Sequence, residues 1–140
     1  SKLDQKNREL VSKSNFILQR NEYLKKIKTK LESSKQSDNK DLQSASHELN
    51  SVINSDKTYK DFDKMFVNVY PEFYNKLNKI AELSTIDLRL ASYIKMNHTN
   101  SEIAIISGVS SRTIESQRYR LSKKLNLDKD QSLNSFLLSI

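Results

Sequence analysis

The sequence predicts an all-α protein, because glycine and proline are almost absent and apolar residues recur at helical spacing along most of the chain. The 140 residues include one glycine and one proline, which leaves little material for the tight turns of β-hairpins. No segment has the pattern of a strand. We expect an N-terminal coiled coil or helical hairpin over residues 1–58, followed by a helical domain over residues 59–140.

A heptad of aliphatic residues marks the first predicted helix, residues 3–32. Its members are Leu3, Leu10, Ile17, Leu24 and Leu31. A polar row lies four positions after the first four of them: Asn7, Ser14, Asn21 and Lys28. One apolar and one polar row are typical of a coiled coil, in which buried Asn fixes the register and favours two strands. We therefore expect the five aliphatic residues to dimerise the chain, with packing inside the chain as the alternative.

The next elements follow from loop composition, apolar spacing and capping signals. Residues 33–41 are polar and predict a loop, after which residues 41–54 form a second amphipathic helix. Paired with a copy, this hairpin would form a four-helix bundle. Residues 55–58 predict a break, and Thr58 with Asp61 has the spacing of a capping box that opens an aromatic-rich helix.

The second half of the chain carries further helix signals. Pro71 is expected at the first position of a helix, where its missing N–H costs nothing. Ser84 and Asp87 have capping-box spacing and open a helix through Met96. Residues 133–140 have apolar residues at helical spacing, and we expect this closing helix to pack on the helices of residues 59–83.

Two short helices separated by the single glycine predict a helix-turn-helix unit with its core at residues 84–127. Thr99 or Asn100 caps the first helix, Gly108 supplies a positive φ at the turn, and Ser110 caps the second helix, residues 110–125. Ala104 is small enough for the helix crossing. The apolar anchors expected on the inner face are Val109, Ile114, Leu121 and Leu125.

The positive charge of the chain lies in two places. The formal net charge is +7. Residues 1–35 carry ten basic and four acidic residues (+6), and residues 110–127 carry five basic and one acidic residue (+4), so the remainder sums to −3. A basic helix behind a helix-turn-helix turn indicates a nucleic-acid partner.

The predicted contacts of the second helix with double-stranded DNA follow from the side that faces away from the apolar anchors. Glu115, Ser116 and Tyr119 lie where a recognition helix reads bases in the major groove. The basic residues expected to hold phosphates are Arg112, Arg120, Lys123 and Lys124. The N–H groups at the start of a helix can bind a phosphate. The remaining candidate DNA contacts therefore lie at the starts of the two helices, and they are Thr99, Asn100, Ser111 and Thr113.

Residues 84–127 resemble the LuxR/GerE-type helix-turn-helix domain. The matching blocks are "SEIA", "VSSRTIE" and "KKLNL". Almost the whole chain is similar to the C-terminal part of Bacteroidetes regulators that carry a propeller-type sensor, a triple-tyrosine domain and one membrane span upstream. The resemblance implies that residues 1–58 are a dimerising segment linked to an upstream membrane sensor, and that the chain is cytoplasmic. The chain does not begin with Met, so we expect a piece of a longer protein.

We therefore expect a dimeric, sequence-specific DNA-binding transcription regulator. The alternative is a helical signalling module that docks a protein such as RNA polymerase. We expect no enzyme, cofactor, metal or small-molecule substrate: the chain lacks cysteine, a phosphate-binding glycine loop and a nucleophile motif. Segment 128–140 lacks the Gly and Glu of a calcium loop, and no apolar run approaches the roughly 18 residues that span a membrane.

Overall fold

The computed structural model describes residues 2–33, 40–53, 56–128 and 130–140. Within these ranges the chain forms eight helices and no strand, which confirms the predicted all-α class. The helices are α1 (Lys2–Ser33), α2 (Lys40–Ile53), α3 (Asp56–Val69), α4 (Phe73–Ile80), α5 (Thr85–Lys95), α6 (Asn100–Ser107), α7 (Ser111–Lys124) and α8 (Leu133–Ser139). Most of the predicted loop 33–41 and the start of the predicted break at Ser55 lie outside the described residues.

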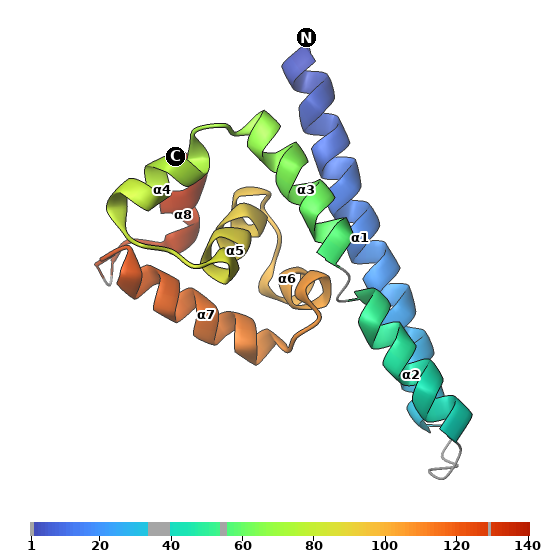
Figure 1. The fold of residues 1–140 in the computed structure, drawn as a ribbon. Coiled ribbons are helices and arrows are strands. Elements are labelled where there is room, and N and C mark those ends of the chain that lie inside the picture. The colour runs from blue at the N-terminus through green and yellow to red at the C-terminus, as the bar shows by residue number, and fades with distance from the viewer. Residues whose placement is uncertain (1, 34–39, 54–55, 129) are drawn as a thin grey trace.

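Helix α1 is a long rod along one side of the molecule, and α2, α3 and α6 pack against it (Figure 1). Helix α2 lies along its C-terminal half and α3 along its N-terminal half, so the two predicted helices of the hairpin do pack together. Helix α6 contacts α1, and α5 packs against α7 and α8. The closing helix therefore packs on α5 rather than mainly on the helices of residues 59–83.

One hydrophobic core joins the N-terminal helix to the rest of the chain. Aromatic residues of α3 and α4 occupy its centre, and the Phe66 ring lies 5.3 Å from the Phe73 ring in an edge-to-face contact. Leu10, Ile17 and Leu18 of α1 belong to the same buried cluster. The predicted boundary at residue 58 therefore does not separate two hydrophobic cores.

The aliphatic heptad of α1 packs largely inside the chain. Leu10 and Ile17 are 0% and 1% exposed, Leu24 and Leu31 are half-buried, and Leu3 is 57% exposed. Helix α3 is amphipathic and packs along α1, so it covers the middle of the row. Leu10 and Ile17 thus belong to the core of their own chain and not to a seam between two copies, which corrects the prediction for these two residues.

Three helices end at a residue in the left-handed conformation, and only one of these residues is glycine. Gly108 has a φ of 70°, Asn97 of 64° and Asn126 of 55°. In each case the following N–H bonds back to the carbonyl five residues earlier, as in Val109 N to Ala104 O at 3.0 Å. This is a Schellman motif. Asn, which tolerates positive φ better than other non-glycine residues, replaces Gly at two of the three ends.

The predicted caps at Ser84, Thr99 and Ser110 are confirmed, and the helix starts predicted at Thr58 and Pro71 are wrong. Ser84 and Thr99 form capping boxes, and Ser110 caps α7. Thr58 does not cap α3, because that helix begins at Asp56 and the Thr58 hydroxyl accepts a bond from Arg20. Pro71 lies in the turn before α4, which begins two residues later.

The position of Leu10 gives a direct stability test. Leu10→Ala should lower the free energy of unfolding by about 2–5 kcal/mol, because it leaves a cavity in the core. Leu3→Ala, the matched change in the same heptad row, should alter it by less than about 0.5 kcal/mol, since Leu3 is exposed. Urea denaturation of both variants measures the difference. Equal losses would place both residues in the same kind of environment and contradict the described packing.

Candidate nucleic-acid interface

Helices α6 and α7 are joined by a short turn whose two ends are capped. The Thr99 hydroxyl accepts from the Glu102 N–H at 3.2 Å, and a Glu102 carboxylate oxygen accepts from the Thr99 N–H at 2.9 Å. The hydrogen bond from the Thr99 backbone holds the pKa of Glu102 below its ordinary value. Ser110 accepts from the Thr113 N–H at 3.1 Å. The start of each helix is therefore fixed by its own sequence.

The inner side of α7 is apolar and buried, as predicted. Ile114, Leu121 and Leu125 are almost fully buried, and Ala104 of α6 is buried with them. Val109 is an exception, because it is 38% exposed at the surface beside the turn. It was predicted as an inner anchor, but the Schellman motif directs the chain away from the core at this residue.

The outer side of α7 brings most of the predicted DNA contacts onto one exposed face. Thr113 is half-buried near the first turn. The exposed residues are Ser111, Arg112, Glu115, Ser116, Tyr119, Arg120 and Lys123. Tyr119 is 63% exposed, and the Lys123 ammonium lies 4.7 Å from the centre of its ring. We name these eight residues of α7 the outer face.

Lys124 is held by an ion pair inside the domain. Its ammonium lies 2.6 Å from a carboxylate oxygen of Asp87, the residue that closes the capping box of α5. Burial alone would raise the pKa of Asp87, but the hydrogen bonds from Lys124 and from the Ser84 N–H outweigh it and lower the pKa. This pair ties the last turn of α7 to the start of α5, so Lys124 is less available to a phosphate than predicted.

The two other predicted contacts lie at the start of α6. The Thr99 hydroxyl accepts a hydrogen bond from the Glu102 N–H, and Asn100 is half-buried.

Gln117 and Arg118 face the domain, as expected from their positions on α7. The Arg118 guanidinium donates to the Asn134 side chain, and burial lowers the pKa of Arg118.

A buried asparagine connects α1 to the end of α6, a contact that was not predicted from the sequence. Asn21 is 1% exposed and its amide donates to the carbonyls of Ile105 and Ile106, both at 3.0 Å. The hydroxyl of Tyr59 also donates to the Ile106 carbonyl. The Arg20 guanidinium donates a hydrogen bond to the Asn21 amide oxygen at 2.9 Å. The polar row of the heptad indicated a buried Asn, but its partner is α6 of the same chain.

A second polar contact joins α1 to the loop before α6. Ser14 is buried and bonds to the Nε2 atom of His98. The His98 Nδ1 atom lies 3.8 Å from a carboxylate oxygen of Glu102. Burial lowers the pKa of His98, and the nearby Glu102 only partly offsets this. The polar row of α1 thus contacts the start and the end of α6.

The described part of the chain contains neither a metal-binding cluster nor a membrane-spanning helix. Among residues 2–33, 40–53, 56–128 and 130–140, no three His, Cys, Asp or Glu side chains are grouped so that they can hold a metal ion. In the same part of the chain, none of the helices combines the length and the apolar character that crossing a bilayer requires.

The asparagine contact gives a second stability test. Asn21→Ala should lower the free energy of unfolding by about 1–3 kcal/mol, because the carbonyls of Ile105 and Ile106 lose a donor in a buried place. Asn7→Ala removes the same side chain from an exposed position of the same polar row, so it should have little effect. Thermal and urea unfolding of the two variants measures this, and a neutral Asn21→Ala would contradict the contact.

Comparison with known proteins identifies no relative, because no family model, no curated protein and no solved structure matches the chain.

Proposed function

We propose that this chain is a sequence-specific DNA-binding transcription regulator with a LuxR/GerE-type helix-turn-helix, in which α7 enters the major groove. The observation that carries the proposal is the division of α7 into two sides. Its inner side is apolar and buried, and its outer face presents cations and hydrogen-bonding side chains to solvent. A recognition helix needs this arrangement, because the inner side fixes its angle and the outer side meets the duplex.

The outer face contains both kinds of contact that specific recognition requires. Arg112, Arg120 and Lys123 are exposed cations that can neutralise phosphates. Glu115, Ser116 and Tyr119 lie between them and can hydrogen-bond to base edges, Glu to cytosine N4 for example. Ser111 and Thr113 flank the helix N-terminus, where free N–H groups favour a phosphate. Thr99 and Asn100 lie in the same way at the N-terminus of α6 and are the corresponding candidates there.

The first test measures affinity for duplex DNA as a function of salt. Arg120→Ala should weaken binding to all sequences and reduce the slope of log affinity against log salt by about 0.9, the effect of one lost phosphate contact. Lys79→Ala, which removes an exposed cation of α4, is the control and should leave the slope unchanged. Fluorescence anisotropy with a labelled duplex provides both values.

The absence of binding to any duplex at low salt would contradict the proposal. A shallow salt dependence, with equal effects of Arg120→Ala and Lys79→Ala, would favour the alternative in which this module docks a protein such as RNA polymerase. Selection from a random oligonucleotide pool separates base reading from phosphate contact. Tyr119→Ala should change the selected sequence, whereas Arg120→Ala should keep it.

We further propose that the active form is a homodimer that uses the solvent side of α1. Two of the five predicted dimer residues, Leu10 and Ile17, are buried inside the chain, so a second copy cannot pack on these two. Phe16 is 57% and Tyr23 is 66% exposed, and they are seven residues apart, which places them in one row on α1. A groove lined by Arg8, Val11, Ser12 and Gln19 lies beside Phe16. A dimer would place two α7 helices on one duplex, and in this proposal an upstream membrane-linked sensor acts on α1.

The dimer test compares two pairs of exposed apolar residues. Phe16→Ser with Tyr23→Ser should convert a dimer to a monomer without loss of helix content, because both side chains face solvent in the single chain. Val67→Ser with Ile80→Ser changes two exposed residues of α3 and α4 and should leave the dimer intact. Sedimentation equilibrium measures the mass. A monomer in the unmodified 140-residue chain at every accessible concentration would contradict this part of the proposal.

A further inference from the structure

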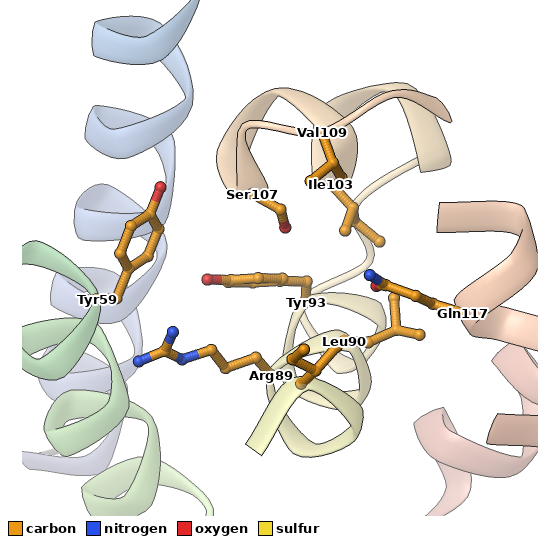
Figure 2. A pocket seen from close by; sticks show the side chains of 9 residues that line it. Tyr59, Arg89, Leu90, Tyr93, Ile103, Ser107, Val109 and Gln117 are labelled. Carbon is orange, nitrogen blue, oxygen red and sulfur yellow. The ribbon is translucent and has the colours of Figure 1, made fainter. Parts of the chain in front are cut away.

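A cavity of about 220 Å³ lies behind the α6–α7 turn, between α3, α5, α6 and α7. Figure 2 shows that its lining combines aliphatic side chains with the polar ends of Arg89, Tyr93 and Ser107. It is smaller than the roughly 300–1,000 Å³ of sites for drug-sized ligands. Its volume therefore suits a small metabolite-sized molecule.

Tyr93 presents a buried hydroxyl to this cavity. The residue is 2% exposed, and its side chain lines the cavity. In Figure 2 the hydroxyl points toward the side of the cavity where Tyr59 and the Arg89 guanidinium lie. Burial raises the pKa of Tyr93, so the phenol stays protonated and can donate. This hydroxyl is therefore a hydrogen-bond donor that an acceptor on a bound molecule can use.

Arg89 supplies a cation with incomplete pairing at the same wall. Its Nε atom is buried and has no partner among the described residues. Its terminal nitrogen reaches Asp63 only at 3.5 Å, the outer limit of a hydrogen bond, and one Asp63 oxygen is itself buried without a partner. Burial raises the pKa of Asp63, although Arg89 opposes this. The guanidinium also lies 5.5 Å from the Tyr59 ring.

The rest of the lining suits an apolar group. Leu90, Ile103 and Val109 line the cavity, and Val109 stands at its exposed edge beside Gly108. The Ser107 hydroxyl points toward Tyr93 from the other side of the cavity (Figure 2). Gln117 also lines the cavity, and its amide points into it (Figure 2), so a bound molecule would meet aliphatic carbon and one amide at the end away from Arg89.

We propose that this cavity binds a small organic carboxylate with a flat apolar body. The carboxylate accepts hydrogen bonds from the Tyr93 hydroxyl and the Arg89 guanidinium, and the apolar body packs against Leu90, Ile103 and Val109. Arginine and carboxylate form charge-assisted hydrogen bonds, which are stronger than those between neutral groups. A neutral molecule of the same shape would lose most of this contribution.

The location of the cavity suggests a regulatory role, which rests on the proposed DNA-binding function. Ser107 and Val109 flank Gly108, the residue that sets the direction of α7. A molecule held between α5 and this turn would change the position or rigidity of α7, and so the affinity for DNA. The binding itself does not depend on this role and is tested in the absence of DNA.

The experiment titrates the complete 140-residue chain with benzoate and follows the methyl signals of Leu90, Ile103 and Val109 by NMR. Benzoate should shift these signals saturably in the millimolar range or below, and benzyl alcohol, its neutral counterpart, should bind at least about 10-fold more weakly because it lacks the charge-assisted bonds. No saturable shift with benzoate would overturn the proposal, and so would equal affinity for the two probes.

Variants test the assigned atoms. Tyr93→Phe removes only the hydroxyl and should weaken benzoate binding about 10-fold, the effect of one hydrogen bond to a charged group. Tyr74→Phe is the control, because Tyr74 is a half-buried tyrosine that does not line the cavity. Val109→Phe fills the exposed edge and should abolish binding in a folded protein. Unchanged binding in Tyr93→Phe and Val109→Phe would overturn the proposal.

The same titration in the presence of duplex DNA separates the two proposals. Benzoate binding without any binding of DNA would support the carboxylate site and contradict the DNA-binding function. DNA binding without saturable benzoate shifts would support the DNA-binding function and contradict the carboxylate site.

Discussion

The carbonyl groups at the C-terminal end of α6 determine how the parts of this molecule are assembled. The last carbonyls of a helix have no partner within the helix and must find donors elsewhere. Here the Val109 N–H bonds to Ala104, the Asn21 amide bonds to Ile105 and Ile106, and the Tyr59 hydroxyl bonds to Ile106. These donors come from the turn, from α1 and from α3. A single short helix end therefore fixes the N-terminal rod, the aromatic helix and the direction of α7 relative to one another.

This arrangement gives α1 a part in the α6–α7 unit. A coiled-coil helix that only dimerised could rotate or slide without affecting the domain that follows it. Helix α1 cannot do so, because its polar row bonds to both ends of α6, through Ser14 and His98 on one side and Asn21 on the other. A movement of α1 would break both hydrogen bonds of the Asn21 amide, each of which contributes about 0.5–1.5 kcal/mol. Within the proposed function, this is the physical link between an upstream signal and the helix that meets DNA.

Helix α7 separates two chemically different regions. Its outer face is exposed and rich in cations, and its inner side is part of the core and borders the cavity that Arg89 and Tyr93 line. The Lys124–Asp87 ion pair joins the end of α7 to α5, so the helix is held at both ends, by the capped turn and by this pair. The two proposals therefore concern opposite sides of one rigid element.

The sequence alone determined the features that depend on neighbouring residues. The helical class, the caps at Ser84, Thr99 and Ser110, the turn at Gly108 and the two sides of α7 follow from local hydrogen bonds and from helical periodicity, so they could be predicted. The tertiary structure decided which surface covers each apolar row. The heptad of α1 fitted a second copy and a helix of the same chain equally well, and α3 covers Leu10 and Ile17. The partners of Asn21 and Lys124, and the cavity beside Tyr93, arise from residues distant in the sequence, because side chains meet there only after the helices have packed.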